Sequence, residues 1–162
     1  MSQLYSKYTS DSVLNFSVAE LHITDIYPFK TGERLPLPLY SMATSAGFPS
    51  PADDHMERSY DLNELLIKHP LATYLVRVSG NSMVGAGIHS GDLLIVDRSL
   101  EPIEGKIVIA ALNGELTVKR LYKMQGVLHL LAENPDYDPI PVDPDSELQI
   151  WGVVVYAIHK PA

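Results

Sequence analysis

The 162-residue sequence contains no cysteine. This absence excludes disulfide bonds and thiolate metal sites and is typical of a reducing compartment. No stretch approaches the ~20 apolar residues that a membrane-spanning helix needs. The first residues, MSQLYSKYTSDSVLNF, lack the basic start and the apolar run of a signal peptide. We therefore expect a cytoplasmic protein with no membrane partner.

Positive charge is scarce in this chain. Twelve Lys and Arg residues face 20 Asp and Glu residues, so the formal net charge is −8. Such a chain is not attracted to a phosphate backbone, and we expect no direct binding of nucleic acid. An acidic protein can still act beside DNA through protein partners. The remaining composition, with 46% hydrophobic residues, is that of a globular domain with a packed core.

Prolines interrupt the first 60 residues, where hydrophobic periodicity is weak. The segment RLPLPLYSMATSAGFPSPADD (34–54) cannot be helical, because each proline removes a donor and biases the preceding residue to extended geometry. We expect an extended arm here. After it, Asp61 and Glu64 resemble a capping box ahead of an apolar stripe, and His69-Pro70 is a stop signal. This pattern predicts one short helix over 61–68.

From residue 71 onward the hydrophobic pattern changes to the period of a β-strand. The predicted strands are LATYLVRVS (71–79), DLLIVD (92–97), KIVIAAL (106–112), ELTVKRLYK (115–123), GVLHLLA (126–132) and LQIWGVVVYAIH (148–159). Asn113-Gly114 is a strong hairpin signal. Strands so close together, without helices between them, predict a mostly-β, antiparallel fold. The last strand is apolar enough for either an interface edge or a buried core position.

One polar residue stands out in VSGNSMVGAGIHSGDLLIVD (78–97). Ser82 follows a predicted buried strand and lies among glycines. It could be a helix N-cap, because serine is a preferred cap. It could also be a nucleophile, if a base reaches it and backbone N–H groups hold an oxyanion. The G-x-S-x-G elbow is missing because Val84 stands where that motif has glycine, and no S-x-x-K motif occurs.

A base for Ser82 is less obvious. The six histidines are scattered, and none is distinguished by its context. In ELTVKRLYK, alternation places Thr117, Lys119 and Leu121 on one face of the strand. A lysine on an apolar face can be desolvated, which lowers its pKa toward the range of a general base, and the Thr117 hydroxyl could orient its amine. The alternative is an ordinary solvated strand lysine.

Three motifs together resemble the LexA/UmuD family of self-cleaving serine peptidases, peptidase family S24. They are SGNSM at 79–83, GDLLIVD at 91–97 and ELTVKRL at 115–121, and Lys119 follows Ser82 by 37 residues. The resemblance implies a LexA/signal-peptidase-like antiparallel β fold of the β-clip type, with one short helix and an extended N-terminal arm. It implies Ser82 as nucleophile and Lys119 as general base, with no cofactor and no metal.

The same resemblance implies that the protein cuts its own arm at Ala46–Gly47, which lies 36 residues before Ser82. A small side chain followed by glycine lets an extended strand enter a narrow cleft. The backbone N–H groups of Ser82 and Asn81 would form the oxyanion hole. The resulting domain division is an arm removed by self-cleavage (1–46), the remaining arm with the short helix (47–70), and a Ser–Lys peptidase-like β domain (71–162).

The UmuD branch of the family is the closer one, from about Leu35 to the C-terminus. Repressors of the LexA branch carry a helix-turn-helix domain that needs roughly 60–70 helical residues, and only 45 residues precede Ala46. A LexA-like repressor remains the alternative. A signal peptidase would need a membrane anchor, and a non-catalytic interaction module would not need the Ser–Lys pair. Residues 1–34 are longer than the usual arm of this branch and have no assignment.

The resemblance to the UmuD branch also implies partners. A RecA filament on single-stranded DNA would act as co-protease. The product, 47–162, would form a homodimer and serve a UmuC-like Y-family polymerase in translesion synthesis during the SOS response, and the uncut form would restrain that polymerase. Leu35–Tyr40 is a candidate contact for the sliding clamp, with simple arm packing as the alternative.

Overall fold

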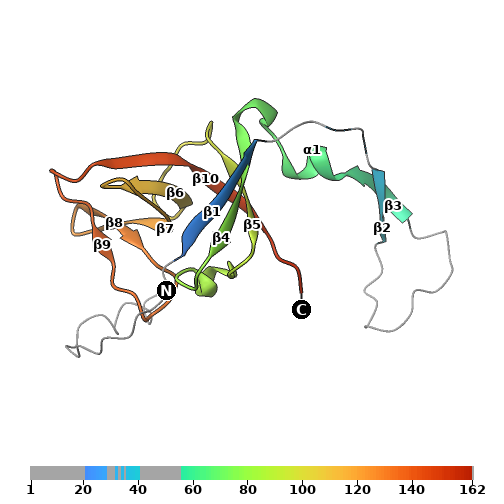
Figure 1. Ribbon diagram of the computed structural model, residues 1–162. Coiled ribbons are helices and arrows are strands. Elements are labelled where there is room, and N and C mark those ends of the chain that lie inside the picture. Colours follow the sequence, from blue (N-terminus) through green and yellow to red (C-terminus); the bar gives the residue numbers. More distant parts are fainter. Residues whose placement is uncertain (1–20, 29–31, 33, 35, 41–55, 162) are drawn as a thin grey trace. The chain divides into compact units, whose positions relative to one another are not determined.

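The structure, a computed structural model, describes residues 21–28, 32, 34, 36–40 and 56–161 (Figure 1). The chain divides into two compact units. One unit consists of Met1–Phe29 together with Ala72–Ala162, and the other is Lys30–Leu71. None of the helices in the described residues is long and apolar enough to span a membrane.

The larger unit contains one eight-stranded sheet. Its strands are β1 (His22–Pro28), β4 (Thr73–Ser79), β5 (Leu93–Asp97), β6 (Ile107–Leu112), β7 (Glu115–Met124), β8 (Val127–Leu131), β9 (Ile140–Pro141) and β10 (Leu148–Ile158). Their order is β1-β4-β5-β10-β6-β7-β8-β9, and every pairing is antiparallel. The prediction of a mostly-β, antiparallel fold is therefore confirmed.

The sheet curls, and this curl brings distant strands together. β1 contacts β7, although β4, β5, β10 and β6 lie between them in the sheet. Two apolar clusters fill the curled sheet. The first includes Leu21, Val78, Met83 and Val118, and the second includes Val108 and Leu130. The first cluster backs the end of β4, and thus the segment that contains Ser82.

The predicted strands from residue 71 onward are all present with small changes at their ends. The Asn113-Gly114 hairpin is confirmed: both residues have left-handed backbone, with φ of 50° and 87°, as the favoured two-residue hairpin turn requires. This turn fixes the register in which Val108 of β6 pairs with Lys119 of β7. β10 lies between β5 and β6, so it is an interior strand rather than a sheet edge.

The smaller unit contains a two-stranded antiparallel sheet and the helix. β2 (Pro36–Tyr40) pairs with β3 (Met56–Asp61), and α1 covers Leu62–Leu66. Asp61 is the N-cap, and its carboxylate accepts from the Asn63 N–H at 2.9 Å. The predicted helix is thus confirmed, with narrower bounds than 61–68. Two short 3-10 helices cover Pro70–Ala72 and Val84–Ala86.

The sequence predicted no strands before residue 60, but the structure has three that begin there. β1 consists of HITDIYP, whose β-branched residues favour extended backbone, and it pairs with β4 along its length. The sequence alone did not indicate this partner, because local periodicity is weak there. β2 contains two prolines, which a strand accepts where it has a free edge. Leu35 and the predicted cleavage site, Ala46–Gly47, lie outside the described residues.

Tyr74 connects β4 to the interior strand β10. Its hydroxyl donates to the Trp151 carbonyl at 3.3 Å, and the Arg98 guanidinium lies 5.8 Å from its ring centroid. Burial raises the pKa of the Tyr74 hydroxyl to about 12, although the positive charge of Arg98 acts in the opposite direction. The folded state therefore holds the neutral phenol. Its contribution to stability is complete below pH 10 and is lost as pH rises from 10 through about 12.

We expect Tyr74→Phe to make stability less sensitive to alkaline pH. The free energy of unfolding, measured by urea denaturation between pH 9 and pH 12, should fall less steeply for this variant than for wild type. Tyr156→Phe, at an exposed tyrosine of β10, serves as the matched control and should follow the wild-type curve. Equal slopes for Tyr74→Phe and wild type would contradict this account.

Candidate active site

Ser82 lies in the segment that joins β4 to β5, here called the serine loop (residues 80–92). The loop begins at Gly80, whose φ of 111° is reserved in practice for glycine. Ser82 follows two residues later and is fully buried. Met83 packs into the first apolar cluster behind the loop. The glycine turn therefore directs Ser82 back into the molecule rather than toward solvent.

The Ser82 hydroxyl has two neighbours from distant parts of the chain. Lys119 Nζ lies 3.3 Å from Ser82 Oγ, and the backbone N–H of Leu21 donates to the same oxygen at 3.3 Å. The N-cap interpretation is wrong, because the short helix that follows has Met83 as its N-cap, with no side-chain capping bond. The hydroxyl is instead positioned against an amine, as a nucleophile next to its base would be.

Lys119 is held inside the protein by strand β7. Only 1% of its surface is exposed, and its Nζ donates to Thr117 Oγ1 at 2.7 Å. The two residues therefore share a face of β7, as alternation predicted, and the solvated-lysine alternative is wrong. Water cannot stabilise an ammonium ion at this depth, and desolvation favours the neutral amine, the form that can accept a proton.

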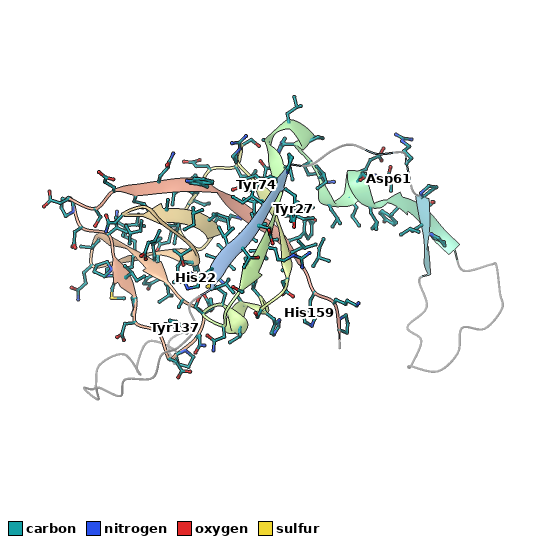
Figure 2. The ribbon with its side chains drawn as sticks, in the orientation of Figure 1. His22, Tyr27, Asp61, Tyr74, Tyr137 and His159 are labelled. Atoms are coloured by element: carbon teal, nitrogen blue, oxygen red, sulfur yellow. The ribbon has the colours of Figure 1, made fainter. Side chains whose placement is uncertain are left out.

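A second segment, after β8, clamps the serine loop through three hydrogen bonds. Asn134 Nδ2 donates to the Asn81 carbonyl at 3.0 Å, and the Tyr137 hydroxyl donates to the Asn81 side-chain oxygen. The Gly85 N–H donates to the Glu133 carbonyl at 2.7 Å. Tyr137 lies on the connection after β8 (Figure 2). The clamp binds the acceptor groups of Asn81 and leaves its backbone N–H for another partner.

The backbone N–H groups of Asn81 and Ser82 donate to no acceptor in the described part of the chain. Two unpaired amides beside a buried hydroxyl could donate hydrogen bonds to a developing oxyanion. Thr117, the neighbour of Lys119, also lines a cavity of about 360 Å³ to which neither Ser82 nor Lys119 contributes. The residues that line it come from β1 and from strands on the β6–β9 side of the sheet: His22, Ile23, Leu112, Glu115, Leu116, Thr117 and Ile140.

Sequence reasoning found Ser82, Lys119 and Thr117 and missed the residues that hold them. Leu21 belongs to the region without an assignment. Asn134 and Tyr137 lie in LAENPDYD, which looks like an ordinary polar turn. No local signal distinguishes these residues, because their contacts with Asn81 and Ser82 span 53 to 61 positions.

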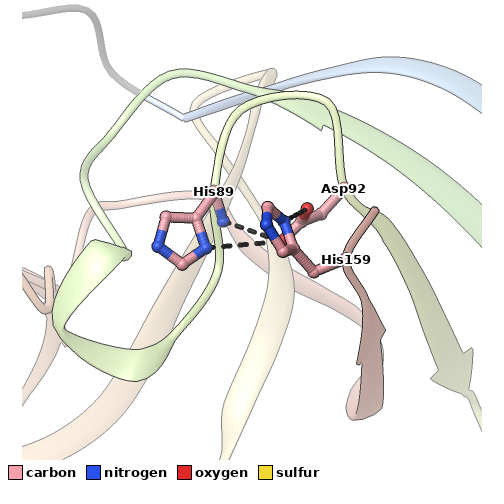
Figure 3. Close-up of side chains that lie close together, drawn as sticks. All are labelled: His89, Asp92 and His159. Carbon is pink, nitrogen blue, oxygen red and sulfur yellow. Dashed lines mark hydrogen bonds and ion pairs between the residues drawn. The ribbon is translucent and has the colours of Figure 1, made fainter. Parts of the chain in front are cut away.

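A separate polar cluster lies where the serine loop meets the end of β10. It contains His89, Asp92 and His159 (Figure 3). Gly91-Asp92 forms a turn in this cluster: Gly91 has φ of 93°, and the Asp92 carboxylate accepts from the His89 N–H at 2.8 Å. Among the described residues, this is the one cluster whose ligand types and spacing could hold a metal ion.

The comparison with known families identifies the class of protein. The peptidase S24-like family model matches residues 38–155, which include Ser82, Lys119 and Asn134. The chain therefore belongs to the peptidase S24-like family, and the resemblance to the LexA/UmuD family is confirmed. The match begins after β1, so the strand that reaches Ser82 through Leu21 lies outside the part that the family model describes.

Individual relatives agree with this assignment. The chain is 49% identical to the protein SamA of Salmonella typhimurium over 123 residues, which cover 76% of this chain and 85% of SamA. It is 45% identical to the protein MucA of Escherichia coli over 123 residues, 75% of this chain and 84% of MucA. It is also 45% identical to the LexA repressor of Bordetella petrii over 130 residues, 80% of this chain but 57% of the repressor.

We expect Gly85→Ala to disturb the clamp on the serine loop. A Cβ at this position would lie 2.5 Å from the Glu133 carbonyl oxygen, so one of two backbone segments must shift. Overpacking of this kind costs about 1–3 kcal/mol of unfolding free energy. Urea denaturation would measure the loss, and hydrogen exchange at the Gly85 amide would locate it. The control is Val84→Ala at the exposed neighbour; equal stability for both variants would contradict the clamp.

Proposed function

We propose that this protein is a self-cleaving serine peptidase that cuts its own chain between Ala46 and Gly47. Membership of the peptidase S24-like family supports serine peptidase chemistry. The observation that carries the assignment of residues is the 3.3 Å contact between Lys119 Nζ and Ser82 Oγ, at a lysine that is 1% exposed. A buried, hydrogen-bonded amine next to a buried hydroxyl fits a general base and its nucleophile.

In the proposed reaction, neutral Lys119 accepts the proton of Ser82 as Oγ attacks the Ala46 carbonyl carbon. The N–H groups of Asn81 and Ser82 hold the oxyanion of the tetrahedral intermediate. The Lys119 ammonium then gives its proton to the Gly47 nitrogen, the peptide bond breaks, and Ala46 remains as an ester on Ser82. Water, deprotonated by Lys119, hydrolyses this ester and restores Ser82. Thr117 orients the amine throughout, through its 2.7 Å hydrogen bond.

The proposed biological role follows the UmuD-like character of the relatives. SamA, MucA and ImpA match more than four fifths of their own length, which favours a UmuD-like protein of SOS mutagenesis over a larger regulator. In this role a RecA filament promotes cleavage, and the product 47–162 acts as a homodimer with a UmuC-like Y-family polymerase. The segment 35–40, which includes β2, is the proposed contact for the sliding clamp, and the uncut chain restrains the polymerase.

The second candidate is a LexA-like cleavable repressor, which the 45% identity to a LexA repressor favours. It would need a DNA-binding element, and the net charge of −8 opposes one. A gel-shift experiment with damage-gene operators separates the two candidates. Binding by the uncut chain that is lost after cleavage would favour the repressor.

Incubation of the purified full chain should release a fragment that begins at Gly47. We expect this fragment in the presence of RecA, an ATP analogue and single-stranded DNA, and also without RecA at alkaline pH. Ser82→Ala and Lys119→Ala should give no fragment, because each removes one partner of the proton transfer. Lys123→Ala, at an exposed lysine of the same strand, is the matched control and should cut normally. Intact-mass spectrometry measures all four proteins.

The pH profile provides a separate check on Lys119. If its amine must lose a proton before it acts, spontaneous cleavage accelerates as pH rises and then levels off. Measurements should stay below pH 10, where Tyr74 remains neutral. A rate that does not change from neutral to alkaline pH would contradict the assignment of Lys119 as the base, and a fragment from Ser82→Ala would contradict the assignment of Ser82.

A further inference from the structure

Strand β1 places main chain where a substrate would have to lie. The Leu21 N–H donates to Ser82 Oγ at 3.3 Å, and Leu21 is fully buried in the first apolar cluster. A carbonyl that Ser82 attacks must come within about 3–3.5 Å of Oγ. The backbone N–H of Leu21 already lies at that distance from Oγ, so it competes with an incoming peptide for the space beside the hydroxyl.

The edge of β4 is the surface that an extended substrate would use. β1 pairs with β4 from His22↔Ser79 to Pro28↔Tyr74, and it is the outermost strand on that side of the sheet. Without β1, β4 would present free backbone groups along an edge that leads directly to Ser82. Extended peptides add to such edges through main-chain hydrogen bonds. β1 also contacts β7, the strand that carries Lys119.

Few side chains hold β1 in this position. Every residue from Thr24 to Pro28 is exposed, and the apolar anchors are Leu21 and Ile23. The ladder with β4 is also irregular between Ile23 and Asp25. A strand with so few buried contacts can leave its partner more readily than an interior strand. β1 therefore combines a blocking position with a weak attachment.

We propose that β1 is an internal competitor of the cleavage segment: it occupies the β4 edge and must leave before Ala46–Gly47 can reach Ser82. This inference rests on the proposed self-cleavage and concerns its regulation. The occupant comes from the chain itself, upstream of the segment that the family model matches. Release of β1 would then be a step that an activating partner could promote.

A reversible cross-link tests the proposal in the full chain. Asp25 and Arg77 are exposed Cα partners in the β1–β4 ladder, and Cα atoms of antiparallel partners lie about 4.5–5.5 Å apart, within disulfide range. Because the chain has no cysteine, Asp25→Cys with Arg77→Cys can form one intramolecular disulfide. The oxidised form should cut itself at least about tenfold more slowly than the reduced form, because β1 cannot leave.

The matched control cross-links a strand pair that need not open. Met124 and Val127 are partners in the β7–β8 hairpin, and Met124→Cys with Val127→Cys should cut at similar rates in both redox states. A second variant, Leu21→Ser, removes the main anchor of β1 and should accelerate cleavage. Equal rates for the oxidised and reduced Asp25–Arg77 pair would overturn the proposal, even if Leu21→Ser were too unstable to measure.

A binding measurement distinguishes failure of this proposal from failure of the proposed function. A fluorescent peptide with the sequence of residues 40–52 is titrated onto the Asp25–Arg77 pair that also carries Ser82→Ala. Weaker binding to the oxidised form, by about tenfold or more, supports competition even if no form cleaves itself. The same affinity for both forms would show that β1 does not occupy the binding edge.

A second inference rests on the cluster of His89, Asp92 and His159, which is independent of the Ser82 chemistry. Asp92 is 2% exposed, whereas both histidine rings are about half exposed. His159 Nδ1 lies 2.8 Å from Asp92 Oδ1, and His89 Nδ1 lies 3.8 Å from Oδ2. One ligand atom from each residue falls within 4.8 Å of the others (Figure 3).

These residues match the requirements of a zinc-type ion. Two imidazoles and one carboxylate suit Zn²⁺ at about 2.0–2.2 Å and leave a fourth position for water. Ca²⁺ and Mg²⁺ prefer sets of oxygen ligands. The His89 backbone N–H holds Asp92 Oδ2 at 2.8 Å, which orients the carboxylate, and the exposed rings can turn to close the site. We infer that this cluster binds Zn²⁺ or a similar divalent transition metal and thereby ties the serine loop to the chain after β10.

Metal titration of the full chain tests this inference. Zn²⁺ binding is measured by calorimetry and Co²⁺ binding by its visible absorption, in wild type and in His159→Ala, His89→Ala and Asp92→Asn. We expect one ion per chain and at least about tenfold weaker binding in each variant. His159 follows the last strand, so its loss should not unfold the sheet. His129→Ala, at a histidine outside the cluster, is the control and should bind the metal like wild type. No binding by wild type, or unchanged binding by His159→Ala, would overturn the inference.

Discussion

The buried amine of Lys119 is the constraint on which the rest of this structure depends. An ammonium ion in the core is costly unless it is paired with an opposite charge. The buried amine of Lys119 therefore needs hydrogen-bond partners inside the protein. Thr117 supplies one such partner two residues away, at 2.7 Å, and Ser82 supplies the other from 37 residues away, at 3.3 Å. The Asn113-Gly114 hairpin, the curl of the sheet and the serine loop all serve to bring these three groups together.

Polar contacts outside the apolar core keep the serine loop in place. Met83 anchors the loop to the first cluster, while Asn134 and Tyr137 hold Asn81 through hydrogen bonds. In the proposed mechanism, a Ser82 that is held so firmly is in place before any substrate arrives. Control of the proposed self-cleavage would then come from access to Ser82 rather than from assembly of the site, and the contact of Leu21 with Ser82 fits that requirement.

Sequence reasoning succeeded where structure follows local pattern. Runs of β-branched residues predicted β4 to β8 and β10 closely, Asn113-Gly114 predicted the tight hairpin, and Asp61 predicted the helix start. The short strand β9 was not predicted. Sequence reasoning failed at β1, where HITDIYP forms a strand because β4 offers it a free edge. It also missed His159, which lies 67 positions from Asp92. In both cases the partner, rather than the residue's own neighbours, decides the outcome.

By itself the sequence determined the class of fold, the family and the Ser82–Lys119 pair. Strand period, turn residues and motif spacing can all be recognised from short stretches of sequence. The tertiary structure alone decided that Lys119 is buried, that Asn134 and Tyr137 clamp the serine loop, and that Leu21 reaches Ser82. Burial depends on how the curled sheet closes on itself, and it brings together residues more than 50 positions apart. Contacts at that separation arise from chain topology, and no local pattern encodes them.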